Sequence, residues 1–422
     1  MDSGSDSTKA GFANGDQPHS VFPTMIGHLK YPGLLSDVDY NFREYYVGEE
    51  ARNLRGVLSL VFPVECGMVT NWEAIEKIWH YIFHDLLQIN PSEHPVLLTE
   101  PPLNPAQNRE KMAEILFENF NVPAIYVSSS AVLSLLASGR TTGLVIDMGE
   151  SVTHIVPIYK GIPITSAICR LDIGGHDITK YLYHLLRQRS VEVYGYTFSH
   201  PLNGVSHIIA RETKERFCYV ALDPARELRL AEEDSQIETQ ITLLFDRILT
   251  IGSERFLAPE ILFAYEGMNR SVQPLHEAMY QAMLQCGIDL RNDLCQNIVL
   301  SGGSSQFPGL KERLCKELTE IMPETSKIRI IAPPERGLSA WIGGAMLASH
   351  KIFPNLWFSR KEYMEQGPIA VHHPFLRDLK INSLKALPTH LCPFCGTTGL
   401  ITGQKTKKRE YVFCPTCQNI LH

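Results

Sequence analysis

The sequence has 422 residues, of which 44% are hydrophobic and 20% charged, and its formal net charge is −7. A chain of this length can bury large cores in two or more domains, and its composition is typical of globular proteins. The negative charge argues against general nucleic-acid binding, no apolar run is long enough to span a bilayer, and the acidic, polar start is unlike a secretory signal.

The N-terminal segment DSGSDSTKAGF combines small residues, hydroxyls and a lysine, which suits a phosphate-binding loop. It begins so early that we expect no β-strand in front of it. Further along, Thr70 and Glu73 have the spacing of a capping box and predict the start of a helix. The residues expected on its buried face recur at helical spacing: Ile75, Ile78, Trp79, Ile82 and Leu86.

Strands and helices alternate in the next hundred residues, which predicts an α/β architecture. We expect a buried strand at 94–100, an amphipathic helix at 104–120 and a second strand at 124–127. A helix rich in alanine and leucine should follow and close near Gly139.

The stretch 143–164, GLVIDMGESVTHIVPIYKGIPI, predicts a β-hairpin, because two apolar runs flank a polar tip. The tip carries Asp147, Gly149 and Glu150. A glycine lets backbone N–H groups approach a phosphate, and a carboxylate can hold a hydrated Mg²⁺. An ordinary acidic turn remains the alternative.

Beyond the hairpin, we expect Asp177 to cap a helix at 178–187, and a further helix at 208–220 carries Lys214 and Glu215. A strand then ends in the pair Gly302-Gly303 before another helix, and a flat ligand can lie against the backbone at such a turn. The acidic, glycine-containing tips near the N-terminus and in the hairpin suggest two related halves that face one cleft.

Two C-x-x-C pairs stand near the C-terminus, and eighteen residues separate them. This spacing predicts a zinc ribbon in which four thiolates form a closed, structural Zn²⁺ site, with two redox-active pairs as the alternative. The predicted ligands are Cys392, Cys395, Cys414 and Cys417.

Basic and aromatic residues lie between these pairs, and they leave three uses open: docking of a protein, binding of nucleic acid, or a solvated hairpin tip. They are Lys405, Lys407, Lys408, Arg409, Tyr411 and Phe413. The other six cysteines are scattered, as expected of reduced thiols in a reducing compartment: Cys66, Cys169, Cys218, Cys286, Cys295 and Cys315.

Long segments of the chain, over roughly residues 2 to 375, closely resemble actin and the actin-related proteins. They include KAGFA at Lys9, HPVLLTEPPLNPAQNREKM at His94 and AVLSLLASGRTTG at Ala131. Further matches are VTHIVPIY at Val152, TIGSERF at Thr250, VLSGGSS at Val299 and IIAPPERGLSAWIGGAMLAS at Ile330. The resemblance implies an α/β, two-lobed actin-like fold, shared with Hsp70 and the sugar kinases, here with an added C-terminal zinc ribbon.

The resemblance also implies ATP or ADP with Mg²⁺ or Ca²⁺ between the lobes. Asp2 and Asp147 would orient waters of the metal, and His154 matches the family histidine near the attacking water. The implied nucleotide-binding residues are Ser5, Lys9, Asp147, Gly149, Glu150, Lys214, Glu215, Gly303 and Ser304. A solvated helix face, a plain turn and a buried core histidine are the simpler alternatives for these residues.

Several residues depart from the family pattern at this site. Asp6 stands where the family has glycine, and a carboxylate beside a triphosphate is repulsive unless a metal screens it. Glu150 and Ser151 replace an aspartate and a glycine, and Gly337 removes a lysine near the adenine. Ser130 replaces the glutamine that aligns the hydrolytic water, and it is too short for that reach. Because water alignment is a positioning effect, we expect weak or absent ATPase activity, with the nucleotide as a clamp between lobes.

The family's first strand is missing from the start of the chain. We expect either a truncated gene model, which we favour, or the loss of one central strand, which would leave backbone groups unpaired at a buried edge.

Segments that match filament contacts of the family also differ. The segment 31–46 is longer, glycine-poor and charged, the segment 265–270 carries Glu266 and Arg270 where the family has an apolar plug, and 190–206 holds an insertion. Burying such charges in a filament interface is costly. We therefore expect poor self-polymerisation and protein partners in a heteromeric complex, with actin or an actin-filament end among the candidates.

The expected organisation is an actin-like body at 1–375, with small subdomains at 23–60 and 174–260, a linker at 376–388 and the ribbon at 389–422. The favoured function is a cytoplasmic, cytoskeletal or complex-scaffolding subunit that docks a partner through its ribbon. The alternatives are an active, filament-forming ATPase and a nuclear, nucleic-acid-associated subunit.

Overall fold

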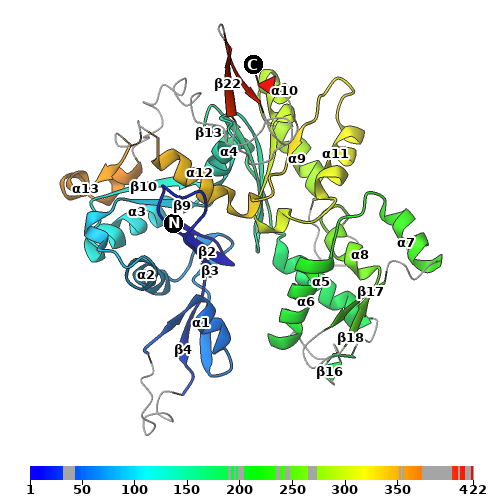
Figure 1. Ribbon diagram of the computed structural model, residues 1–422, viewed down its shortest axis with the longest axis horizontal. Coiled ribbons are helices and arrows are strands. Elements are labelled where there is room, and N and C mark those ends of the chain that lie inside the picture. Colours follow the sequence, from blue (N-terminus) through cyan, green and yellow to red (C-terminus); the bar gives the residue numbers. More distant parts are fainter. Residues whose placement is uncertain are drawn as a thin grey trace.

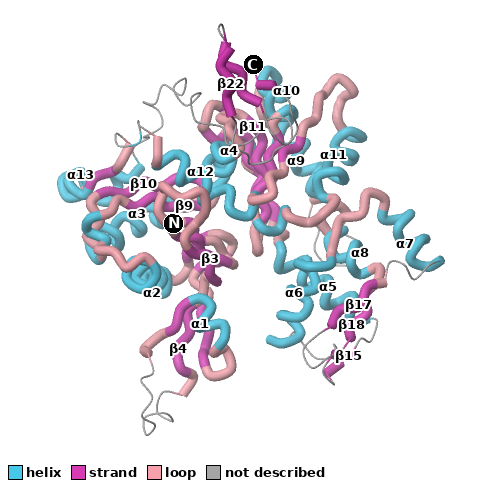
Figure 2. Tube along the Cα trace, viewed as in Figure 1, coloured by secondary structure: helices cyan, strands magenta, loops and turns pink. Residues whose placement is uncertain are grey.

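Two large hydrophobic cores organise the chain. The elements around them form two parts that lie side by side (Figure 1, Figure 2). We call the part built around strands β9 and β10 the first half, and the part built around β11, β12 and β19 the second half. The computed structural model describes residues 1–31, 43–188, 192–193, 196–197, 204–233, 238–242, 248–264, 273–350, 353, 356–372, 402–406, 409–413 and 420–421.

In the first half, β9 and β10 are parallel, β21 is antiparallel to β10, and helices α2 and α3 belong to the same part (Figure 1). The predicted apolar face of α2 is confirmed, because Ile75, Ile78, Trp79 and Ile82 are all buried. The elements are β1 Asp2–Ser3, β2 Ser7–Ala10, β3 Ser20–Pro23, β4 Ile26–Leu29, β5 Tyr46–Val47, α1 Gly48–Asn53, β6 Leu58–Val61, β7 Val64–Glu65, β8 Met68–Val69, α2 Trp72–His80, a π-helical turn Tyr81–Leu86, a 3-10 turn Pro91–Glu93, β9 Val96–Glu100, α3 Ala106–Glu114, a π-helical turn Ile115–Asn119, β10 Ala124–Ser129, α4 Ser130–Ala137, β21 Phe358–Ser359, α13 Arg360–Gln366 and a 3-10 helix Pro368–His372.

In the second half, the predicted hairpin is confirmed: β11 and β12 are antiparallel, and Asp147 lies opposite His154 near its tip. β19 runs parallel to β11, and the side chains of Leu144, Val145 and Ile146 are fully buried between layers. The elements are β11 Gly143–Met148, β12 Thr153–Tyr159, β13 Ile162–Pro163, a 3-10 turn Thr165–Ala167, β14 Cys169–Leu171, α5 Gly175–Gln188, β15 Glu192–Val193, β16 Tyr196–Thr197, α6 Gly204–Phe217, α7 Pro224–Glu233, β17 Thr239–Thr242, β18 Ile248–Ile251, α8 Glu254–Glu260, α9 Leu275–Leu284, α10 Ile288–Gln296, β19 Ile298–Ser301, 3-10 turns Gly303–Ser305 and Arg336–Leu338, α11 Leu310–Ile321, β20 Ile330–Ile331 and α12 Ser339–Ala348.

Helices α4 and α12 join the halves, because they pack on each other between β9 of the first half and β11 of the second. A third buried cluster, which includes Leu133, Val145 and Val299, fills this layer. Gly343 makes the approach possible, since a Cβ there would lie 1.8 Å from the carbonyl oxygen of Leu133. The two helices therefore meet backbone to backbone at this point.

The start of the chain is hydrogen-bonded to β9 of the first half. The N-terminal amine of Met1 donates to the Leu97 carbonyl (2.8 Å), and the amide of Thr99 donates to the Met1 carbonyl (3.1 Å). Asp2 and Ser3 form β1, which pairs with β2, so the segment predicted to bind phosphate itself begins with a short strand. These bonds satisfy backbone groups at the outer edge of β9.

The predicted capping box of α2 is wrong by one residue. Asn71 is the N-cap, and its Oδ1 accepts from the amide of Ala74 (3.0 Å), whereas the Thr70 hydroxyl donates to the Pro63 carbonyl (3.4 Å). Asparagine caps helices at least as well as threonine, so the sequence alone does not decide which of these two neighbouring residues is the N-cap.

The bounds of two further helices also differ from the expectation. α5 begins at Gly175, so Asp177 lies inside its first turn and does not precede the helix. From there its carboxylate accepts from the amide of Gly174 (3.0 Å). α6 ends at Phe217: the amide of Cys218 still donates to the Lys214 carbonyl (3.3 Å), but the amide of Val220 donates to the Pro308 carbonyl (2.8 Å).

Near the C-terminus, three strands form an antiparallel sheet in the order β22-β23-β24. They are β22 Thr402–Thr406, β23 Arg409–Phe413 and β24 Ile420–Leu421. The β22–β23 hairpin lies, in sequence, between the two C-x-x-C pairs.

Among the described residues, none of the helices combines the length and the apolar character that crossing a membrane requires.

Candidate functional site

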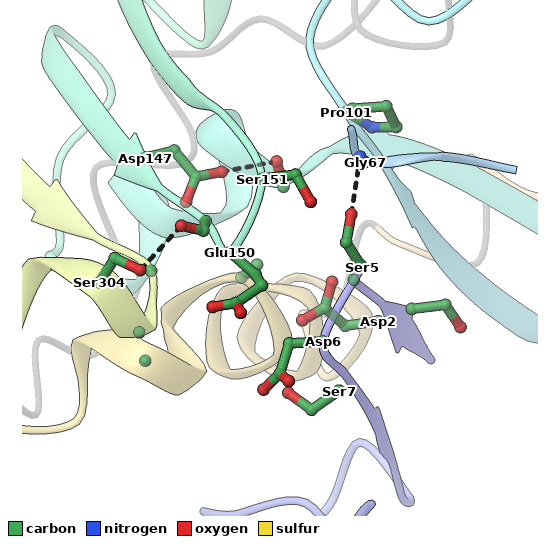
Figure 3. A pocket seen from close by; sticks show the side chains of 18 of the residues that line it. Asp2, Ser5, Asp6, Ser7, Gly67, Pro101, Asp147, Glu150, Ser151 and Ser304 are labelled. Atoms are coloured by element: carbon green, nitrogen blue, oxygen red, sulfur yellow. Dashed lines mark hydrogen bonds between the residues drawn. The ribbon is translucent and has the colours of Figure 1, made fainter. Parts of the chain in front are cut away.

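A cavity of about 490 Å³ lies between the halves and is walled by both of them. The β1–β2 loop and β9 contribute from the first half, and the β11–β12 hairpin, α6 and the turn after β19 from the second. Figure 3 shows Asp2, Ser5 and Asp6 on one side and Asp147 and Glu150 on the other. All the residues predicted for nucleotide, metal water and catalysis line it: Asp2, Ser5, Lys9, Ser130, Asp147, Gly149, Glu150, His154, Lys214, Glu215, Gly303 and Ser304.

The β1–β2 loop is a tight turn, closed by the amide of Gly4 donating to the Ser7 carbonyl (3.0 Å). Ser5 Oγ accepts from the amide of Gly67 (2.9 Å, Figure 3), so it keeps its own hydrogen for an acceptor in the cavity. Lys9 Nζ lies 3.4 Å from Asp2 Oδ2, which places a cation at the mouth of the loop. A hydroxyl and an ammonium in this arrangement suit a phosphate group.

The hairpin tip opposes this loop with a buried carboxylate. Burial raises the pKa of Asp147, and the charge of Asp2 acts in the same direction. The Ser130 hydroxyl donates to Asp147 Oδ2 (3.0 Å) and counteracts part of this effect. The two carboxylates therefore repel each other in the cavity, and a cation bound between them would offset this repulsion.

Glycines let the hairpin approach its neighbours. Ser304 Oγ donates to the Gly149 carbonyl (2.8 Å) and ties the turn after β19 to the hairpin. Gly302 has φ +86°, and a Cβ there would lie 2.2 Å from the Met148 carbonyl oxygen. A Cβ on Gly303 would meet no protein atom within 4 Å, so this backbone faces open cavity, as contact with a ligand requires.

Lys214 reaches the cavity from α6 and is almost fully buried. Its Nζ donates to the Gly175 carbonyl (2.9 Å) and lies 3.9 Å from Glu150 Oε2. Burial lowers the pKa of Lys214 and raises that of Glu150, and the attraction between the two charges opposes both changes. Desolvation thus outweighs the attraction within the ion pair. An additional charged or polar partner would stabilise the charged forms of these two side chains.

Arg211 is a cavity residue that sequence reasoning missed. It lies three residues before Lys214 on α6, and its guanidinium donates to both carboxylate oxygens of Asp6, at 2.6 Å and 2.8 Å. Its Nε donates to Glu215 Oε1 (2.8 Å). Residues three and four apart share a helix face, so the spacing to Lys214 and Glu215 was the signal available.

Burial tends to raise the pKa of Asp6, but the hydrogen bonds and charge of Arg211 outweigh it and lower that pKa, with help from Lys9 and Lys214. The carboxylate at this position, expected to repel a phosphate, is therefore ionised and held by the second half of the chain.

His154 lies on β12 with only 5% of its surface exposed. Its pKa is lowered to about 4, chiefly by burial and next by the charge of Arg170. The imidazole is therefore neutral near pH 7 and a weak base.

Gly337 faces the amide of Gln306, whose Nε2 would be 3.2 Å from a Cβ at position 337. Both residues line the cavity. Gln306 thus occupies part of the space next to the position of the family's lysine.

The residues fit the implied ligands. The open backbone at Gly303 leaves room for a flat group, Ser5 and Lys9 offer donors to phosphate, and the carboxylates of Asp2 and Asp147 are the ligand type that hydrated Mg²⁺ or Ca²⁺ prefers. Among the described residues, no group of three or more His, Cys, Asp or Glu side chains is arranged to hold a metal ion.

Other predicted features lie outside the described residues. These are the four predicted zinc ligands at 392, 395, 414 and 417, most of the segments 31–46 and 190–206, and the segment 265–270.

A protein-family model described as Actin matches residues 1–375 of this chain. The match includes every residue that lines the cavity and ends before the two C-x-x-C pairs. Because it covers well over half of the sequence, the chain belongs to the actin family.

Proposed function

We propose that this chain is a divergent actin-family protein that binds ATP or ADP with Mg²⁺ or Ca²⁺ between two lobes, formed by its two halves. The actin family in general binds this nucleotide and metal. The proposal is supported by the donors of Ser5, Lys9 and Lys214 in one cavity with the carboxylates of Asp2 and Asp147. The nucleotide would serve as a clamp between the lobes, and hydrolysis would be weak or absent.

The proposal of weak hydrolysis rests on the environment of Ser130. Its hydroxyl donates to Asp147 (3.0 Å), so the one hydrogen it can offer is committed to a carboxylate. It is two bonds shorter than the glutamine of the family pattern and cannot reach a water over the phosphates. His154 has a pKa of about 4 and is a poor proton acceptor at neutral pH. When bound, the metal would neutralise phosphate charge. The side chains of the cavity would hold the nucleotide but would neither align nor deprotonate the attacking water.

Replacement of the short side chain tests this reading. We expect the wild-type protein to release phosphate from ATP near the background rate, and Ser130→Gln to accelerate release at least tenfold with nucleotide affinity changed only a few-fold. An amide placed to align water acts mainly on turnover. The exposed residue Ser166 provides the matched control, Ser166→Gln. Wild-type hydrolysis as fast as that of conventional actin would contradict the proposal.

We further propose that the C-terminal segment is a zinc ribbon that docks a protein partner. Support comes from the spacing of the two C-x-x-C pairs and from the antiparallel sheet of β22, β23 and β24, whose strands lie, in sequence, between and after them. Elemental analysis of the purified full-length chain should find one zinc per chain, lost in Cys414→Ser. A metal-free preparation that keeps this sheet would count against the ribbon.

The same protein is proposed to act as a cytoplasmic subunit of a heteromeric complex and not as a filament former. The charged segments at 31–46 and 265–270 support this, because charges are costly in filament contacts. Sedimentation with Mg-ATP and salt should leave the chain in the supernatant, and robust homopolymer would exclude this part of the proposal.

A further inference from the structure

We propose that the ion pair between Asp6 and Arg211 makes the cavity select a nucleoside diphosphate over the triphosphate. The inference rests on the proposed nucleotide site and adds which phosphate chain that site accepts. Asp6 follows the predicted phosphate donor Ser5 in the β1–β2 loop, and Arg211 comes from α6 in the other half of the chain.

The geometry of the pair commits the arginine. Two guanidinium nitrogens bind the two oxygens of Asp6 at 2.6 Å and 2.8 Å, and the third binds Glu215 at 2.8 Å. A fork-to-fork arrangement of this kind is the strongest contact between arginine and a carboxylate. Three of the five guanidinium N–H groups thus already donate to carboxylates, and Asp6 and Glu215 together offset the charge of Arg211, so a phosphate would compete with both carboxylates for it.

The other two cations of the cavity are also paired. Lys9 lies 3.4 Å from Asp2, and Lys214 lies 3.9 Å from Glu150. In the described part of the cavity wall, each of the three cations thus has a carboxylate partner. Each additional phosphate must therefore share a cation with a carboxylate that already lies beside it, or bring its own cation.

The formal charge of the wall points the same way. Among the described residues, its carboxylates outnumber its cations by three, or by two when Glu100 is set aside because Arg109 pairs with it from outside the wall. The buried amine of Met1 adds little positive charge because burial lowers its pKa to about 6. A divalent cation can offset a diphosphate, but the further charge of a third phosphate meets an acidic surface. The carboxylates are Asp2, Asp6, Glu100, Asp147, Glu150 and Glu215, and the cations are Lys9, Arg211 and Lys214.

Neutralising Asp6 should therefore act twice, because it removes one negative charge and releases Arg211 toward the phosphates. Removing Arg211 should do the opposite and leave an uncompensated carboxylate. The two substitutions are thus expected to move nucleotide preference in opposite directions, which a mere loss of packing would not do.

The test is calorimetric titration of the full chain with ADP and with a non-hydrolysable ATP analogue, both with MgCl₂. We expect the wild-type protein to bind ADP at least tenfold more tightly than the analogue. Asp6→Asn should shift this ratio at least tenfold toward the analogue, and Arg211→Met should shift it further toward ADP. Asp289→Asn, which removes an exposed carboxylate on α10 away from the cavity, should leave the ratio unchanged.

Equal or tighter wild-type binding of the analogue would overturn this inference, as would an Asp6→Asn protein that binds ADP with an unchanged ratio. Either result would leave the proposed nucleotide site intact. If the folded wild-type protein binds neither nucleotide, the proposed function itself fails, and this inference fails with it.

Discussion

His154 illustrates how its surroundings fix the charge of one side chain. It lies on the inward face of the hairpin, 5% exposed, and its pKa is about 4 against an ordinary value of 6.5. Burial is the larger cause and Arg170 the second, while Asp172 opposes them. The folded chain therefore holds this imidazole neutral over a range in which the unfolded chain protonates it.

This difference predicts a pH dependence of stability with a definite sign. Between pH 6.5 and pH 4 the unfolded state binds more protons at His154, so the free energy of unfolding falls as the pH falls. From pH 7 to pH 5, the wild-type protein should lose about 2 kcal/mol more than His154→Gln. Urea unfolding at both pH values measures the loss.

Exposed His19 provides the control, since His19→Gln should follow the wild-type profile. Parallel losses in wild type and His154→Gln would show that the imidazole is not held neutral.

At the same scale, the sequence located the cavity residues well but not their partners. Asp6 departs from the family pattern in the sequence, yet its contact with Arg211 joins residues 205 positions apart. Nothing local in the sequence encodes such a pair, because it depends on how the halves approach. The reach of Ser130 could be inferred from its length alone, whereas its bond to Asp147 could not.

At the scale of elements, the packing of α4 on α12 holds the two halves together, because α12 contacts β9 and α4 contacts β11. Gly343 allows this contact, and a Cβ there would lie 1.8 Å from the Leu133 carbonyl oxygen. A backbone atom at this distance cannot swing aside as a side chain would. The helices would have to separate, and the third hydrophobic cluster would open with them.

Gly343→Ala should therefore lower the free energy of unfolding by at least about 2 kcal/mol, despite the better helix propensity of alanine. Gly344→Ala is the matched control on the same helix, because its nearest neighbour is the flexible end of Leu97 at 3.1 Å. Thermal or urea unfolding compares the two. An equal effect of both substitutions would show that the backbone contact at Gly343 does not limit the packing.

Element types followed from the sequence more reliably than their bounds. The continuous apolar run Leu144–Ile146 and the periodic apolar face of α2 are both strong signals. The start of α2 depends on which of two adjacent polar side chains turns back to cap it, and the end of α6 depends on acceptors supplied by distant loops. Such choices are decided by tertiary contacts that a local pattern does not contain.

At the scale of the whole molecule, two hydrophobic cores face a shared cavity, and the ion pair of Arg211 on α6 with Asp6 in the first half joins its two walls. Within the second half, Ser304 and Lys214 tie their segments to the hairpin and to Gly175. A bound nucleotide would add contacts to both walls at once. Ligands that bind only the folded state stabilise it in proportion to their concentration over the dissociation constant.

The most direct measurement is the adenine-nucleotide content of the native, full-length protein, followed by its melting temperature with and without added Mg-ADP. We predict about one nucleotide per chain, and a melting temperature that falls when the nucleotide is stripped with a chelator and recovers when Mg-ADP is returned. A folded preparation that contains no adenine nucleotide, and whose melting temperature responds to neither ADP nor ATP, would contradict the account.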